Sequence, residues 1–120
     1  MTASNITLII VAVTMSALAQ VALKYGVGRA DIAPDMSLIA KSFGMLFSPY
    51  VMVGLTFYVG SVVFWLFVLR QTDLSLAYPF VGLSFVIVFF MSVFALGEPW
   101  ELNRIIGAAV IVVGIIILAR

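Results

Sequence analysis

Four long runs of apolar residues divide the chain, and each has the length of a helix that crosses a membrane. Such a helix needs about 17–25 predominantly apolar residues. Because lipid cannot hydrogen-bond exposed backbone groups, helices are the expected structure for spans at this spacing. The sequence therefore predicts an all-α membrane protein, with four transmembrane helices in a single domain over residues 1–120. The runs are Ile6–Leu23, Tyr50–Leu69, Leu76–Leu96 and Leu102–Ala119.

The connections between these runs differ in length. Arg70–Asp73 joins the second run to the third and is short enough for a tight turn. The long connection, Tyr25–Pro49, holds apolar residues on one face of a helix wheel, which predicts a short amphipathic helix in the membrane interface. The alternative is an irregular loop, because so short a helix is marginal by itself. The apolar residues of that face are Met36, Ile39, Phe43 and Phe47.

The last connection suggests how the fourth helix begins. Pro99 suits the first turn of a helix, where its missing N–H is not needed. Glu98 and Glu101 suit the positive end of the helix dipole. We therefore expect Glu98 to be an acidic residue at the start of the fourth helix.

Composition agrees with a membrane location. Hydrophobic residues make up 65% of the chain and charged residues 9%, whereas soluble proteins have about 45–50% apolar and about 25% charged residues. A soluble core of this size could not bury so much apolar surface. The net charge of +1 gives no reason to expect nucleic acid as a partner.

The chain contains no cysteine and no histidine. Thiol nucleophiles, imidazole bases, disulfides and nearly all transition-metal sites are therefore excluded. We expect no metal, no cofactor and no enzymatic activity. The first run is expected to be a span and not a cleaved signal peptide, because Met1–Asn5 lacks the basic residue that a signal needs.

Charge gives little indication of orientation. With four spans, Arg70 and Arg120 lie on the side of both termini, and Lys24, Arg29, Lys41 and Arg104 lie on the other side. The positive-inside rule thus favours outside termini only slightly. We therefore hypothesise insertion in both orientations; a C-terminal tag found in one location only would refute it.

A polar stripe marks the first run. Ser16, Gln20 and Lys24 recur every four residues, so they share one face of a helix. Polar groups at membrane depth are costly and usually face protein or a water-filled cavity. Ser16 and Gln20 could hydrogen-bond a ligand or join neighbouring helices. Lys24 could bind a phosphate or anchor the helix at the membrane surface.

Aromatic and small residues mark the other runs. The second carries Gly54, Tyr58, Ser61 and Trp65 at helical spacing, with Tyr58 near mid-span, where its hydroxyl needs a partner or ligand. In the third, Tyr78 precedes Pro79, which is expected to kink the helix and free backbone carbonyls. Tyr78, Gly82, Phe85 and Phe89 share a face there, of which we expect Phe85 and Phe89 to serve packing.

Gly107 and Gly114 in the fourth run are seven residues apart and lie nearly on one face. Small residues let membrane helices approach closely. We expect this face to pack against another helix, in the chain or in a partner. Four helices make a thin bundle, so a homodimer or a heterodimer with a similar chain is expected.

These features together resemble the drug/metabolite transporter superfamily (EamA-like), in particular its half-sized members: the small multidrug resistance proteins and the subunits of the undecaprenyl-phosphate-aminoarabinose flippase. The resemblance covers nearly the whole chain. It implies four helices, a dimer packed through the last helix and alternating access around a central cavity. Its motifs are Ser16–Gln20 with Lys24, Trp65–Leu69, Ala77–Pro79, Phe85–Val88, Glu98–Pro99, and Gly107 with Gly114.

Two positions depart from the multidrug exporters. Ser16 stands where those proteins have a glutamate, and Val81 stands where they have a tryptophan. No Asp or Glu lies inside any of the four runs, whereas a proton-coupled exporter of cations needs a carboxylate in the membrane. The flippase-like members keep a glutamine and a lysine in the first helix, as Gln20 and Lys24 do here.

We therefore expect a multi-pass transporter or flippase of the bacterial inner membrane. It would move a lipid-linked sugar phosphate or a similar anionic amphiphile, with Lys24 on the phosphate. The alternatives are an exporter of small molecules and a non-transporting subunit of a larger membrane complex. The substrate-binding residues expected are Ser16, Gln20, Lys24, Tyr58, Trp65 and Tyr78.

Overall fold

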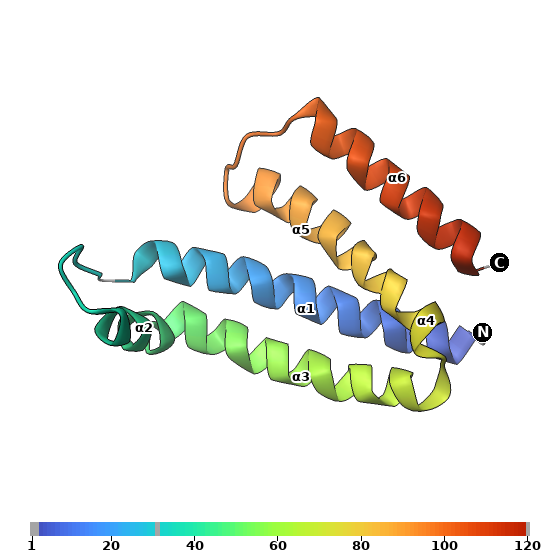
Figure 1. Cartoon of the computed structure of the whole chain (residues 1–120), viewed down its shortest axis with the longest axis horizontal. Coiled ribbons are helices and arrows are strands. Elements are labelled where there is room, and N and C mark those ends of the chain that lie inside the picture. Colours follow the sequence, from blue (N-terminus) through green and yellow to red (C-terminus); the bar gives the residue numbers. More distant parts are fainter. Residues whose placement is uncertain (1–2, 31, 120) are drawn as a thin grey trace.

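The computed structural model describes residues 3–30 and 32–119, and these form helices and no strand. The all-α fold predicted from the sequence is confirmed (Figure 1). The third apolar run is built from three consecutive pieces, and the other runs are continuous helices. The elements are α1 (Ala3–Arg29), α2 (Leu38–Leu46), α3 (Pro49–Gln71), α4 (Leu74–Ala77), the 3₁₀ turn η1 (Tyr78–Phe80), α5 (Val81–Ala95) and α6 (Leu102–Ala119).

Four stretches in the described part of the chain are long and apolar enough to cross a membrane: α1, α3, α4 to α5, and α6. Most of their apolar surface faces outward. The buried share of the most apolar stretch falls from 28% in α1 to 6% in α6. Apolar helices with exposed outer surfaces are expected where lipid is the solvent.

Helices α1 and α3 form the tightest pair and lie side by side (Figure 1). Small residues allow this close approach. Ala12, Ala19 and Gly26 follow one another at seven-residue spacing on α1, and all three are buried. A Cβ atom added at Gly26 would lie 2.6 Å from the backbone nitrogen of Val51, and one at Gly54 would lie 3.0 Å from the carbonyl oxygen of Ala19.

The core lies at the end of the molecule that holds the N-terminus and the turn between α3 and α4 (Figure 1). Residues from five elements meet there, so the core holds the start of the third span against α1. The members of this cluster are Ile9, Val13, Val68, Ala77, Phe80 and Ile115. The break expected at Pro79 falls next to the cluster, in η1.

Among the described residues, helix α6 packs mainly against α5 and the adjoining turn, and its Ile115 reaches the core cluster. A Cβ atom at Gly82 of α5 would lie 3.0 Å from the Cγ2 atom of Ile111, so these two helices touch closely. The face of Gly107 and Gly114 is open, because nothing described lies within 4 Å of a Cβ built at either glycine. The expected packing of this face is therefore not made within the described chain, and a partner remains a prediction.

The loop before α6 corrects one expectation. Helix α6 begins at Leu102 and has no acidic residue in its first turn, so Glu98 and Pro99 lie before the helix. Gly97 has a φ of 71°, which turns the chain at the end of α5. The backbone N–H of Glu98 then donates to the carbonyl of Ser92 at 3.0 Å. Glu98 thus closes the end of α5 and does not start α6.

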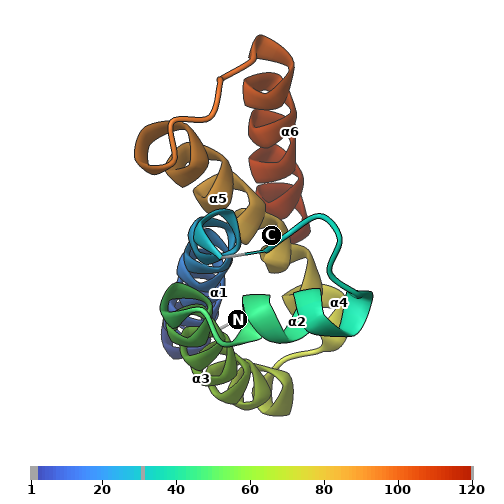
Figure 2. The same cartoon turned by 90° about the vertical axis from the view of Figure 1, so that its left-hand side faces the viewer.

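The amphipathic segment does form a helix, α2, so the loop alternative is wrong. The hydroxyl of Ser37 caps it by accepting from the backbone N–H of Ala40 at 3.1 Å. Met36 precedes its first turn. Figure 2 shows α2 lying crosswise to α1 and α3. Its apolar residues are exposed, 81% for Leu38 and 70% for Ile39, as expected of a helix at a membrane surface.

Candidate functional site

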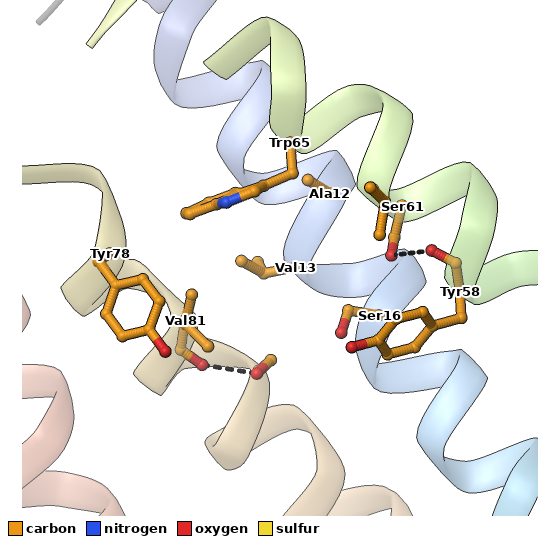
Figure 3. Close-up of a pocket in the computed structure, with 10 residues that line it drawn as sticks. Ala12, Val13, Ser16, Tyr58, Ser61, Trp65, Tyr78 and Val81 are labelled. Atoms are coloured by element: carbon orange, nitrogen blue, oxygen red, sulfur yellow. Dashed lines mark hydrogen bonds between the residues drawn. The ribbon is translucent and has the colours of Figure 1, made fainter. Parts of the chain in front are cut away.

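A cavity of about 210 Å³ lies between α1, α3 and the start of the third span. Figure 3 shows α1 and α3 on one side of it and the η1–α5 segment on the other. The tight α1–α3 pair and the core around Phe80 fix these walls. Its lining residues are Ala12, Val13 and Ser16 from α1; Tyr58, Ser61, Val62 and Trp65 from α3; and Tyr78, Val81 and Ser84 from η1 and α5.

Four residues singled out in the sequence line this cavity: Ser16, Tyr58, Trp65 and Tyr78. They come from three spans and are separated by as many as 62 positions (78 − 16 = 62). Ser16 lies at the middle of α1, and Tyr58 lies near the middle of α3. The cavity therefore reaches the mid-depth of the membrane-spanning helices, where hydroxyl groups gain from a partner.

Gln20 and Lys24 are not part of the cavity lining. Both side chains are exposed. On α1 they lie about 6 Å and about 12 Å beyond Ser16 along the helix axis, at about 1.5 Å per residue, and each step of four residues rotates the position by only about 40°. The stripe therefore continues from the cavity along the same side of α1, toward the end that carries Arg29.

At that end of α1, the guanidinium of Arg29 lies over the ring of Tyr25, which contacts the ring of Tyr50. The guanidinium carbon of Arg29 lies 4.5 Å from the ring centre of Tyr25. The Tyr25 ring meets the Tyr50 ring of α3 edge to face, with 4.8 Å between the ring centres. Tyrosines and basic residues gather at membrane–water interfaces. Lys24 is therefore within about one helical turn of the expected membrane surface.

Two serines complete the polar lining. The Ser61 hydroxyl donates to the carbonyl of Tyr58 at 2.6 Å, and the Ser84 hydroxyl donates to the carbonyl of Val81 at 2.5 Å (Figure 3). In each serine the hydroxyl proton is shared with a backbone carbonyl, and the oxygen keeps its lone pairs. In this arrangement both serine oxygens present lone pairs that can accept a hydrogen bond from a ligand.

Sequence reasoning noted Ser61 beside Tyr58 and Trp65 but did not select it, and it missed Ser84. The 3.6-residue period predicts that the helix face of Tyr78 continues through Gly82 and Phe85. Gly82 packs on α6, and Phe85 is 52% exposed. The η1 turn has about three residues per turn, so positions i and i+3 are aligned there. The cavity wall accordingly runs through Tyr78, Val81 and Ser84, and the proline after Tyr78 was the available signal.

The hydroxyls of Ser16, Tyr58 and Tyr78 form no hydrogen bond with another described residue, so they can donate and accept. None of the residues that line the cavity is charged. Desolvating an ion costs several kcal/mol, whereas one cation–π contact returns about 0.5–2 kcal/mol. The lining therefore suits neutral groups with hydrogen-bonding capacity better than bare ions.

The described residues contain no cluster of three or more acidic side chains that could hold a metal ion. The one ion pair found in the described chain joins Arg104 to Glu101 at 3.7 Å, on the exposed start of α6. Such exposed pairs contribute little to stability. Neither feature adds a charged group to the cavity, so the site acts through hydroxyls, aromatic faces and shape.

Comparison with known proteins finds relatives along the full length. The uncharacterized protein y4nH of Sinorhizobium fredii is 35% identical over 121 residues, which span 100% of this chain and 98% of the relative. The probable 4-amino-4-deoxy-L-arabinose-phosphoundecaprenol flippase subunit ArnE of Pseudomonas savastanoi pv. phaseolicola is 32% identical over 107 residues, with 88% of this chain and 89% of the relative covered. The protein of the same name from Pseudomonas fluorescens is 28% identical over 116 residues, covering 97% of each chain. No family model and no solved structure matches the chain.

These similarities extend through all four spans, because they cover nearly nine-tenths or more of both chains. Together with the four apolar helices they make the protein a multi-pass bacterial membrane protein of the transporter or flippase type. The chain belongs to the family of small bacterial flippase subunits that includes the ArnE proteins.

Proposed function

We propose that this protein is an inner-membrane flippase subunit that carries a lipid-linked sugar phosphate, or a similar anionic amphiphile, across the bilayer by alternating access. One observation carries the proposal: a mid-span cavity with hydroxyl groups in its lining, whose side continues along α1 to an exposed lysine. The polar head of a lipid-linked substrate needs hydrogen-bonding groups, and its phosphate needs a cation nearby. The cavity and the lysine provide these two surfaces in turn. The relatives named ArnE are described as probable flippase subunits for 4-amino-4-deoxy-L-arabinose-phosphoundecaprenol, an amino sugar on a lipid phosphate, which is a substrate of this type.

The residues have separate roles in this proposal. The hydroxyls of Ser16, Tyr58 and Tyr78 hydrogen-bond the polar head, and Trp65 offers an aromatic face. Gln20 and Lys24 hold the phosphate, Lys24 through a charge-assisted hydrogen bond. The apolar tail stays in the bilayer, which meets the exposed outer surfaces of the helices. No bond of the substrate is made or broken, so no catalytic residue is assigned.

A proton-coupled exporter of cations fits less well. Such a protein needs a carboxylate that binds the cation and then releases it on protonation. Ser16 occupies the place where the related exporters carry that carboxylate, and the cavity lining includes no acidic residue. A non-transporting subunit would instead depend on a different membrane protein, and would be recognised by stable co-purification with it.

Transport of a fluorescent polyprenyl-phosphate sugar by proteoliposomes tests the proposal. Lys24→Ala and Gln20→Ala should reduce the rate about tenfold or more, because a charge-assisted contact contributes about 1.5–3 kcal/mol. Lys41→Ala is the matched control, since Lys41 lies on α2 at the same end of the molecule and away from the cavity. Rates that stay unchanged in both α1 variants, or are absent in the parent protein, contradict the proposal.

A further inference from the structure

We infer that a second hollow of the molecule, the α1–α5 groove, binds one anionic phospholipid of the bilayer, with an acyl chain in the groove and the phosphate at Arg29. The groove holds about 390 Å³ and lies between α1, α3 and the last part of α5. It shares no lining residue with the mid-span cavity. The residues that line it include Leu18, Val21, Ala22 and Tyr25 of α1, Phe57 of α3 and Ala95 of α5.

The α1–α5 groove and the cavity lie on opposite sides of α1. Tyr25 follows Ser16 by nine residues, and nine steps of about 100° place the two positions about 180° apart around the helix. Ser16 lines the cavity and Tyr25 lines the groove. A lipid in the groove therefore lies outside the cavity and the polar stripe, and its binding does not depend on the proposed function.

The length of the groove fits one leaflet of a bilayer. Leu18 lies near the middle of α1, and Tyr25 follows it by seven residues, or about 10 Å along the helix axis. The hydrocarbon core of a bilayer is about 30 Å thick, so each leaflet contributes about 15 Å. The groove therefore follows most of the depth of one leaflet and ends near the expected membrane surface.

The lining suits a hydrocarbon chain. None of the residues that line the groove is charged, and Tyr25, toward the surface end, supplies the one hydroxyl. An apolar groove that stayed empty would lose van der Waals contacts on one side. A flexible acyl chain can restore these contacts and brings no unsatisfied polar group to this depth.

Arg29 places a cation where the groove meets the membrane surface. It follows Tyr25 by four residues, so both lie on one face of α1. Its guanidinium carbon lies 4.5 Å from the centre of the Tyr25 ring. Arg29 has no ion pair with a described residue, whereas Arg104 is paired with Glu101. The guanidinium of Arg29 can therefore donate to a phosphate.

The charge of Arg29 favours a lipid with a net negative headgroup. Phosphatidylglycerol and phosphatidylcholine both carry a phosphate, but choline adds a positive charge close to it. One basic residue near the membrane surface favours anionic lipid by roughly fivefold in affinity. The chain can enter the groove in either lipid, so the preference between them should depend on Arg29.

Native mass spectrometry of the full chain in a non-ionic detergent can measure this binding. The delipidated protein is titrated with phosphatidylglycerol or with phosphatidylcholine that carries the same acyl chains. We expect the first phosphatidylglycerol to bind about fivefold more tightly than the first phosphatidylcholine. Arg29→Ala should abolish that preference. Arg104→Ala should keep it, and is the matched control because Arg104 is paired with Glu101 and lies outside the groove.

A second variant tests the groove itself. Ala95 is exposed and lines the groove, so Ala95→Leu should occupy part of the space of the chain. Binding of both lipids should weaken about fourfold or more, the factor that corresponds to one displaced methylene group. Ala109→Leu is the control, because it makes the same change at an exposed position of α6 outside the groove. Equal helix content and equal unfolding temperature of the two variants exclude misfolding as the cause.

Other outcomes overturn the inference. Equal binding of the two lipids by the parent protein, or a preference that survives Arg29→Ala, removes the phosphate from Arg29. Lipid binding that Ala95→Leu leaves unchanged places the chain elsewhere. Displacement of phosphatidylglycerol by a polyprenyl phosphate assigns the groove to the transported substrate, and loss of a dimer in Ala95→Leu assigns it to a second copy of the chain.

Discussion

Three hydroxyl groups from three different helical segments share one small space at the middle of this protein. Ser16, Tyr58 and Tyr78 have no hydrogen-bond partner among the described residues, and Tyr78 is 61% exposed. A hydroxyl at membrane depth without a partner costs roughly 1–3 kcal/mol by protein mutational data. Groups kept at such a cost are typical of a site that a ligand or water fills.

The first prediction concerns the two tyrosine hydroxyls. Tyr58→Phe and Tyr78→Phe keep the ring and remove only the hydroxyl, so each should raise the KM for transport about three- to tenfold. Stability should not fall, since neither hydroxyl bonds to another described residue. The measurement is the concentration dependence of transport in proteoliposomes. Tyr50→Phe is the control, because Tyr50 lies at the start of α3 and outside the cavity; an equal effect there would contradict the assignment.

At the scale of elements, the α1–α3 pair is the most closely packed part of the described chain. Its closeness depends on residues without large side chains, above all Gly26 and Gly54, which meet backbone atoms of the opposite helix. The cavity wall built by Ser16 and Tyr58 spans these two helices. The relative position of the two groups is therefore set by glycine packing one to three turns away.

Gly26 and Gly28 allow a matched test of this packing. A Cβ atom at Gly26 would lie 2.6 Å from Val51, whereas nothing described lies within 4 Å of one at Gly28. Gly26→Ala should destabilise the protein by about 1–3 kcal/mol through overpacking. Gly28→Ala should be neutral or stabilise it by up to about 1 kcal/mol, because alanine favours the helix. Unfolding in mixed micelles measures both, and equal stabilities of the two variants would contradict close packing.

The same elements show what the sequence could predict. Apolar run length and polar spacing were enough to predict the four spans and α2. They also singled out Ser16, Tyr58, Trp65 and Tyr78, which line one cavity in the structure and whose binding role stays a prediction. The wall through Ser84 was missed, because the 3₁₀ turn at Tyr78–Phe80 changes the period from 3.6 to about three residues for one turn, and Pro79 indicates a break there without fixing its geometry. Glu98 was assigned to the start of α6 instead of the end of α5, because the turn at Gly97 depends on a backbone hydrogen bond that residue types do not show.

At the scale of the whole molecule, the bundle is incomplete on one side. Only 6% of the most apolar stretch of α6 is buried, and the helix stands at the edge of the molecule (Figure 2). Lipid can cover apolar side chains, but small residues at fixed spacing are typical of helix–helix contacts. Gly107 and Gly114 provide such a face, which is open in the described chain. We therefore predict that a second α6, from an identical or similar chain, packs there.

Substitution of Gly114 tests that contact without disturbing the chain itself. Gly114→Leu places a large side chain into space that is empty in the single chain, so the helix content should persist. It should block close approach of a second helix and weaken dimerisation about tenfold or more, as overpacking of about 1–3 kcal/mol implies. Ala109→Leu is the control, because Ala109 is exposed and lies two residues from Gly107, about 200° around the helix. Mass measurement of the protein in detergent or nanodiscs distinguishes monomer from dimer, and a dimer that survives Gly114→Leu but not Ala109→Leu would assign the interface to the opposite face of α6.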